Sequence, residues 1–234
     1  GDIEECIEEI AVTGENKVEG VKSFVKTFFK NEEKTDIMEN KSDRKEDSMN
    51  KKNKKELTFM TTVNRFQAKN KDEAVKFISA ITNNHSENFK SDVLEVDLNT
   101  LASAIKSGRA IIPAVIKGKR IEKNFIQQQL FALDIDDMNL SLNELKAKFK
   151  KYPFAMIYTS FSHTEEKPKY RFLFVSDRVV TSADEARAVN IALMKLAGTA
   201  DEKCKDVARI FFAGKEILEI QEKTFNVDKL LKET

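Results

Sequence analysis

The sequence predicts a mixed α/β protein whose core is a split βαβ unit preceded by a smaller αβ module. Short apolar runs of strand type alternate with segments in which apolar residues recur at helical spacing. From residue 127 onward these segments follow the order strand, helix, strand, strand, helix, which is the order of a split βαβ unit. The segments before residue 127 supply the preceding module.

The preceding module contains two strands and two helices. Residues 57–66 alternate in the manner of a strand, and residues 71–82 follow as a helix. Residues 97–108 form a second helix that ends at Gly108, a usual helix terminator. Residues 109–116 then predict one strand, which a turn at 117–119 closes.

The core begins with a strand over residues 127–136. A helix over 141–151 follows, and Ser141 and Glu144 have the spacing of a capping box at its start. Residues 154–162 and 170–176 predict two strands around a charged loop. A helix over 182–198 has the same cap spacing, and the tail predicts one or two further strands and a short helix.

Composition and charge exclude several classes of protein. The net charge of +1 means that any attraction to nucleic acid comes from local clusters rather than from the whole molecule. Two cysteines, Cys6 and Cys204, rule out a disulfide scaffold or a zinc ribbon. No apolar run approaches the roughly 20 residues of a membrane helix, and no signal peptide opens the chain, so we expect a cytoplasmic location.

Three regions are expected along the chain. Residues 1–30 contain short amphipathic helical segments. Residues 31–56 are almost wholly charged or polar, and they are expected to be a disordered linker. Residues 57–234 are expected to form one catalytic domain, and the chain's oligomeric state is left open.

The acidic residues that end the strand over 127–136 are the first candidate site. Residues two apart in a strand point to the same side, so Asp134 and Asp136 project together about 7 Å apart at the backbone. Asp137 faces away or begins the loop. Paired carboxylates of this kind suit Mg²⁺, which prefers oxygen ligands and phosphates. An isolated pair of this spacing more often only starts a turn.

A histidine and several basic residues form the second candidate site. His163 ends an apolar strand beside small hydroxyl residues, and Lys167, Lys169 and Arg171 follow in the charged loop and the next strand. Histidine can donate to a phosphate oxygen, and Lys and Arg add charge that suits a triphosphate. A single histidine otherwise is usually structural, but here a shared sheet brings both strand ends together.

These stretches, in this order, resemble the archaeo-eukaryotic primase superfamily over about residues 58–215. In that family a strand ending in two alternating acids supplies the first metal ligands, and "LDID" with Asp134 and Asp136 is similar to it. A small-x-His motif contacts the nucleotide phosphates, and "SFSH" with Ser162 and His163 stands in its place, although Phe161 departs from the pattern. The resemblance implies an RRM-like sheet core.

The same resemblance leaves the third acid open. In the family a further acid completes the metal site and a basic residue after it reads phosphate. Here Asp201 or Asp206 offers the acid and Arg209 the base, while Asp177 is another candidate that looks more like the start of the following helix. The segment after Arg209 reads as a hydrophobic strand.

The function implied is that of a DNA primase or polymerase domain. It would be a metal-dependent nucleotidyltransferase that makes or extends primers on single-stranded DNA during replication of a phage or mobile element. The resemblance implies a two-metal site of Mg²⁺ or Mn²⁺ and nucleoside triphosphates as substrates, and a replicative helicase is an expected partner. Metal ligands would be Asp134, Asp136 and Asp201 or Asp206; nucleotide ligands would be Ser162, His163, Lys169, Arg171 and Arg209.

Other functions can be distinguished by the residues that the chain contains and by an activity test. The alternative is a catalytically inactive primase-like module that binds DNA or a helicase. Basic segments at 116–123 and 146–151 offer edges for a template backbone, or are simply solvated faces. A rolling-circle nickase needs paired histidines, and the chain has only His85 and His163. Alanine at both Asp134 and Asp136 is expected to leave the fold intact.

Overall fold

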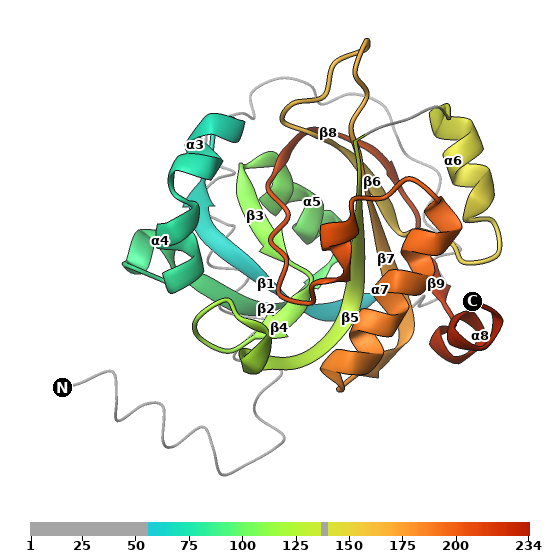
Figure 1. Cartoon of the computed structure of the whole chain (residues 1–234). Helices are drawn as coiled ribbons and strands as arrows, with labels where there is room; N and C mark the ends of the chain where they lie inside the picture. Colours follow the sequence, from blue (N-terminus) through green and yellow to red (C-terminus); the bar gives the residue numbers. More distant parts are fainter. Residues whose placement is uncertain (1–55, 137–139) are drawn as a thin grey trace, which may run out of the picture. The chain divides into compact units, whose positions relative to one another are not determined.

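The computed structural model describes residues 56–136 and 140–234. The expected helices of residues 1–30, the expected linker and Asp137 lie outside the described residues, and the predicted domain boundaries stay predictions. The described part is a mixed α/β structure with two antiparallel sheets (Figure 1), which confirms the predicted class. No helix in the described part of the chain is long and apolar enough to span a membrane.

The preceding module is a three-stranded antiparallel sheet with its helices. The sheet has the order β2-β1-β3, and α5 packs against β2 and β3. Its elements are β1 (Thr58–Gln67), α3 (Lys71–Lys76), α4 (Ile78–Asn83), η1 (Glu87–Phe89), β2 (Ser91–Asp97), α5 (Leu98–Lys106) and β3 (Arg109–Ile112). The sequence predicted neither η1 nor strand β2.

Two predictions for this module are wrong in detail. The single helix expected over 71–82 is broken at Phe77, which ends α3 and begins α4. The Phe77 ring packs 5.0 Å from the ring of Phe66 and 5.2 Å from that of Phe89, so a tertiary contact overrides the local helical pattern. The strand expected over 109–116 is two strands in different sheets, because Pro113 has no N–H to donate to a ladder.

The larger sheet contains the predicted split βαβ unit. Its order is β4-β5-β7-β6-β8, so β7 lies between β5 and β6, which α6 connects. Strand β9 pairs in parallel with β7. The elements are β4 (Ala114–Ile116), η2 (Glu122–Asn124), β5 (Phe125–Ile135), α6 (Leu142–Lys148), β6 (Met156–Ser160), β7 (Tyr170–Val180), α7 (Ala183–Ala197), η3 (Glu202–Lys205), β8 (Gly214–Ile220), β9 (Thr224–Phe225) and α8 (Val227–Glu233).

Helix α7 covers one face of this sheet (Figure 1), packing on β5 and β7 with α6 and α8 beside it. Its buried residues Ala186, Val189, Leu193 and Ala197 recur at helical spacing and face the sheet core. The capping box predicted for Ser141 and Glu144 is present. At α7 only half of the predicted box forms: Ser182 accepts from the Glu185 N–H, while the Glu185 carboxylate pairs with Arg178. The carboxyl half of β5, residues 130–135, is buried in this core.

The hydrophobic strand expected after Arg209 is not formed. Residues 207–213 contain only an isolated bridge between Phe211 and Ile111, and β8 begins at Gly214. From this irregular segment Arg209 contacts Asp134 of β5. The tail beyond it forms two strands and a short helix, as predicted.

Candidate functional site

The acids at the end of β5 lie opposite the cations of β7. The sheet register pairs Asp134 with Arg171, and Arg171 with Tyr158 of β6. Arg171 Nε donates to Asp134 Oδ1 at 3.2 Å, and Lys169 Nζ donates to Asp136 Oδ2 at 3.0 Å. Because side chains alternate along a strand, both ion pairs project from the same side of the sheet.

Asp134 is held from three directions. Asp134 is 7% exposed, and its Oδ2 accepts a hydrogen bond from Arg209 Nη2 at 3.0 Å. Its backbone N–H donates to the Sγ atom of Cys204 at 3.3 Å. Burial raises the pKa of the Cys204 thiol to about 11, so this sulfur is a neutral packing group.

Arg171 is fixed as firmly as the acid it contacts. It is buried, and its guanidinium carbon lies 5.7 Å from the ring centre of Tyr158. Its Nη1 donates to the carbonyl oxygens of Phe212 and Ala213, the latter at 3.4 Å. These contacts leave Arg171 in a position to orient Asp134.

Asp201 is the acid that joins this cluster. Its backbone N–H donates to the carbonyl oxygen of Asp134 at 2.9 Å, and its Oδ2 accepts from Arg209 Nη2 at 2.9 Å. Burial opposes ionisation of Asp201, but hydrogen bonds from the Lys203 N–H and from Arg209 outweigh it and lower the pKa of its carboxyl group. Arg209 therefore bridges two carboxylates.

The two other candidate acids serve local structure. Asp206 is exposed, and its Oδ1 accepts from the N–H of Ala208 at 2.9 Å, closing a turn. Asp177 lies within β7, not at the start of α7 as expected. Its carboxylate accepts from Asn226 Nδ2 and, at 3.1 Å, from the Val227 N–H, so it caps α8.

His163 reaches the acids through Lys169. The backbone N–H of His163 donates to the carbonyl oxygen of Ser160 at 3.1 Å. This bond closes a turn at the end of β6 that contains Ser162. His163 Nδ1 accepts from the Lys169 N–H at 3.0 Å. Because Nδ1 accepts, the ring hydrogen lies on Nε2, and no described residue accepts a hydrogen bond from it.

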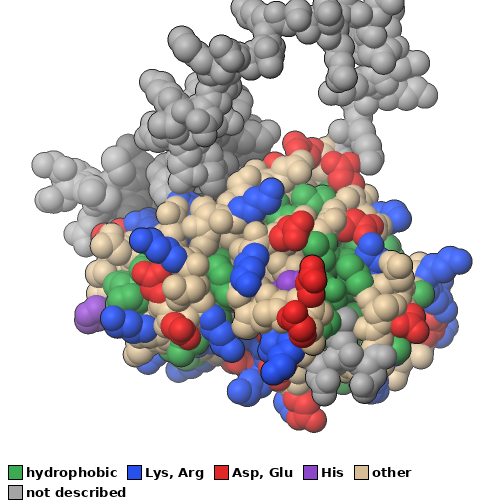
Figure 2. All heavy atoms as spheres, turned by 90° about the horizontal axis from the view of Figure 1, so that it is seen from above, with side chains coloured by type: hydrophobic (Ala, Val, Ile, Leu, Met, Phe, Trp, Pro, Cys, Tyr) green, Lys and Arg blue, Asp and Glu red, His purple; other side chains and the backbone are tan. Residues whose placement is uncertain are grey.

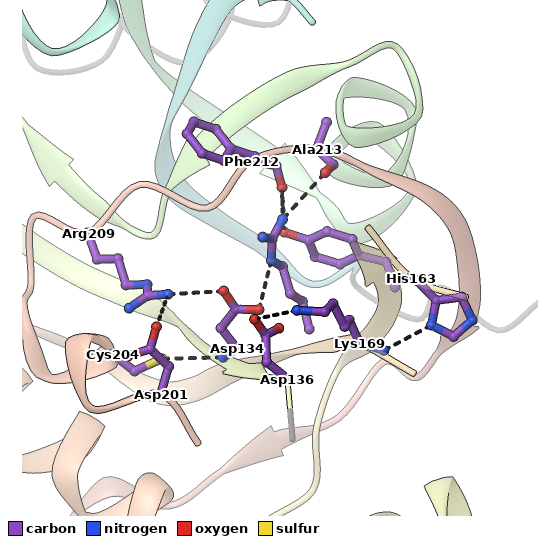
Figure 3. Close-up of polar contacts among 11 residues, drawn as sticks. Asp134, Asp136, His163, Lys169, Asp201, Cys204, Arg209, Phe212 and Ala213 are labelled. Carbon is purple, nitrogen blue, oxygen red and sulfur yellow. Dashed lines mark hydrogen bonds and ion pairs between the residues drawn. The ribbon is translucent and has the colours of Figure 1, made fainter. Parts of the chain in front are cut away.

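The close-up makes the connection visible (Figure 3). Asp134 and Asp136 lie side by side, with Arg209 beyond one of them and Lys169 beyond the other. His163 lies at the far end of Lys169. Three segments distant in sequence thus lie at one end of the sheet, with Lys169 between His163 and the acids. The site roles of Asp134, Asp136 and His163 stay predictions.

The cluster is balanced in charge. Three carboxylates face three cations, and each is paired: Asp134 with Arg171 and Arg209, Asp136 with Lys169, and Asp201 with Arg209. On the face of the molecule in Figure 2, basic and acidic side chains are likewise interspersed. The site carries no strong field of one sign.

The donor chemistry fits a divalent cation in part. Asp134 and Asp136 supply adjacent carboxylate oxygens, the ligands that Mg²⁺ and Mn²⁺ prefer. Within residues 56–136 and 140–234, however, no group of three His, Cys, Asp or Glu side chains is arranged to hold a metal. The arrangement fits a two-carboxylate clamp that substrate phosphates complete, rather than a preformed site for two ions.

Internal contacts occupy most of one expected basic edge, but in the other they engage only Arg120 among the described basic side chains. In the segment 146–151, Lys146 pairs with Glu219, Lys148 donates to the Ala197 carbonyl at 3.1 Å, and Lys151 pairs with Glu233 at 2.5 Å. In the segment 116–123, Arg120 donates to the Ala208 carbonyl and to Thr82.

Sequence reasoning missed several members of the cluster. Tyr158 lies two residues before Ser160 in β6, and only the strand register places it under Arg171. Cys204 had no sequence signal, because a lone thiol gives none. The Phe212 and Ala213 carbonyls belong to backbone that was expected to pair in a strand.

Comparisons with known proteins give one match. No family model matches the chain, and no curated protein does. Among solved structures, the AEP domain of a primase-polymerase (PrimPol) from cyanophage S-2L aligns with 74% of this chain and 87% of its own. The TM-score is 0.44 and the sequence identity is 12%.

Proposed function

We propose that the domain expected over residues 57–234 is a metal-dependent nucleotidyltransferase that synthesises or extends primers on single-stranded DNA. The observation that carries the proposal is the meeting of Asp134, Asp136 and His163 at one end of the larger sheet. The sequence resemblance described above favours the same activity and suggests replication of a phage or mobile element as its setting.

The protein's own groups have separable roles in this proposal. His163 Nε2–H donates to a phosphate oxygen of the incoming nucleotide, because Nδ1 is already occupied by the Lys169 N–H. Arg209 has two buried donors, Nε and Nη1, without a partner among the described residues, which favours a ligand oxygen at that point. Arg171 orients Asp134 and is too firmly held to follow a substrate.

Asp134 and Asp136 would hold a divalent ion, Mg²⁺ or Mn²⁺, with Asp201 the nearest further acid. When bound, such an ion lowers the pKa of a primer 3′-hydroxyl and neutralises charge on the leaving pyrophosphate. Asp206 is assigned no part here, because its carboxylate closes a local turn. Lys169 releases Asp136 for this role and remains free to contact phosphate.

The test is synthesis of labelled products on a single-stranded template with Mg²⁺ or Mn²⁺. Asp136→Asn removes one charge from a side chain that is 48% exposed, and we expect at least a hundredfold loss of product. Asp184→Asn is the matched control, because Asp184 is also an exposed acid paired with one cation, Arg187. Full activity of Asp136→Asn would refute the metal assignment.

A second candidate function is a primase-like module that binds DNA or a helicase without synthesis. The specific observation in its favour is that Asp134, Asp136 and Asp201 are all paired with cations of the protein itself. Complete ion-pair networks of this kind also occur as purely structural features. Retained binding of single-stranded DNA with no product under either metal would favour this candidate.

A further inference from the structure

A separate pocket of about 520 Å³ lies next to the His163 turn. Its walls come from the segment after β1, the end of α5, the turn after β6 and the start of β8. We call it the lysine pocket; Lys69, Lys106, Lys215 and Phe161 line it, together with Gly108 and Gly214. Lys215 Nζ donates to the His163 carbonyl at 3.0 Å, so the pocket adjoins the candidate site.

The charge of the lysine pocket is not compensated. Three lysines line it and, among the described residues of its lining, none is acidic. All three lysines are exposed, and neither Lys69 nor Lys106 has an ion-pair partner within the described residues. The candidate site differs, because every cation there faces a carboxylate. The lysine pocket is therefore suited to an anion.

Two glycines fix the walls of the pocket. A Cβ atom on Gly108 would lie 2.3 Å from the carbonyl oxygen of Ala68, and one on Gly214 would lie 1.8 Å from that of Thr159. These contacts are with backbone, which cannot yield as a flexible side chain can. The close approach of the chain segments is thus built in, and a ligand would meet a preformed pocket.

The surface around the lysine pocket favours single-stranded nucleic acid as the ligand over a single small anion. Lys106 also lines a second hollow of about 360 Å³ between α5 and β8, where Asn99 and Ser103 add polar groups. Lys106 lines both hollows, and Glu219, which pairs with Lys146, also lines the second. Together the two hollows offer room for more than one nucleotide. Phe161, half-buried and without a ring partner among the described aromatic residues, supplies a flat apolar surface of the kind on which bases stack.

We propose that the lysine pocket and the adjoining hollow bind single-stranded nucleic acid, with the three lysines on phosphates and Phe161 against a base. The inference rests on the proposed function in one respect: the bound nucleic acid leads to the His163 turn. Binding itself requires neither metal nor nucleotide, so it can be measured apart from synthesis.

The experiment is fluorescence anisotropy of a labelled single-stranded oligonucleotide with the full chain in EDTA. We expect Lys69→Ala/Lys106→Ala/Lys215→Ala to weaken binding about a hundredfold at low salt. We also expect it to reduce the slope of log K against log salt by about 2, since each phosphate contact contributes about 0.7. Phe161→Ala should weaken binding about tenfold without changing the slope.

The matched control is Lys223→Ala/Lys229→Ala/Lys232→Ala, which removes the same charge from exposed lysines outside the pocket and outside both basic segments. It should bind within about twofold of the unmodified protein, because bulk net charge contributes little. An equal loss of affinity in both triple variants would overturn the proposal, as would unchanged binding by the pocket variant.

Two further measurements separate the possible outcomes. A nucleoside triphosphate alone should not displace the oligonucleotide at equimolar concentration; displacement would identify a free-nucleotide pocket and overturn the strand assignment. If the pocket variant loses binding while the unmodified protein yields no product under either metal, the lysine pocket stands and the proposed synthesis fails.

Discussion

Replacement of Asp134 by alanine tests the ion-pair network directly. The Asp134 side chain is 10% exposed, and the side chains of Arg171 and Arg209 are 9% and 14% exposed. Arg209 keeps Asp201 as a partner in the variant, but Arg171 loses the only carboxylate paired with it among the described residues. The variant thus leaves one buried guanidinium uncompensated.

The expected cost follows from that burial. Breaking a buried ion pair from one side destabilises a protein by about 3–5 kcal/mol. Asp136→Ala breaks a pair whose partners are 22% and 48% exposed, so it should cost no more than about 1 kcal/mol. The initial expectation that both acids can be removed without structural effect therefore does not fit the burial of Asp134.

The assay is urea unfolding followed by far-UV circular dichroism, since the chain has no tryptophan. With a slope of about 2 kcal/mol per molar urea, Asp134→Ala should lower the midpoint by about 2 M. The double variant Asp134→Leu/Arg171→Met, which removes both charges, should recover much of the loss. If Asp134→Ala unfolds within about 1 kcal/mol of Asp136→Ala, the buried pair does not exist as described.

Three further predictions concern other parts of the described structure. Gly214→Ala should destabilise the domain by more than about 3 kcal/mol, because its Cβ would collide with the Thr159 carbonyl oxygen. Gly118→Ala is the comparison: Gly118 has φ +86° and no atom within 4 Å of the added Cβ, so this change should cost about 1 kcal/mol in the same unfolding assay. Burial raises the pKa of Tyr158 to about 12. The unfolded state therefore loses this proton first, and the stability of the fold should decrease as the pH rises from about 10 to about 12. Tyrosine absorbance at 295 nm that titrates fully near pH 10 in the folded protein would contradict this. Cys204, whose pKa burial raises to about 11, should stay unreactive toward a thiol reagent at pH 8 until urea unfolds the protein, and rapid labelling of the folded chain at this position would show that the thiol is accessible.

Most of the fold was accessible from local pattern. Strands β5, β6 and β7 and helices α6 and α7 follow from apolar periodicity and from the Ser141 and Ser182 caps, since these signals are contained within each segment. The failures have one nonlocal and one local cause. The packing of Phe77 against two other rings breaks a predicted helix, and Pro113 divides one apolar run between two sheets.

The candidate site was accessible only in part. Alternation along a strand indicates that Asp134 and Asp136 share a side, and the split βαβ order indicates that His163 ends in the same sheet. The choice between Asp201 and Asp206 depends on how residues 201–209 turn, and no periodic signal encodes those turns. The ion pairs of Arg171 depend on register across three strands, which a single sequence does not specify.

The passage of the chain through Pro113 bears on how the protein can be rebuilt. One residue separates β3 from β4, and the Thr62 hydroxyl of β1 donates to the Ala114 carbonyl at 2.8 Å and accepts from the Ile116 N–H at 3.1 Å. The first strand of the small sheet, β1, is therefore hydrogen-bonded to β4 of the large sheet. A graft of β5 to β8 alone would carry the acids and the histidine but would leave β5 without its partner β4. Because β4 is in turn hydrogen-bonded to Thr62 of β1, the smallest transplantable unit begins at β1.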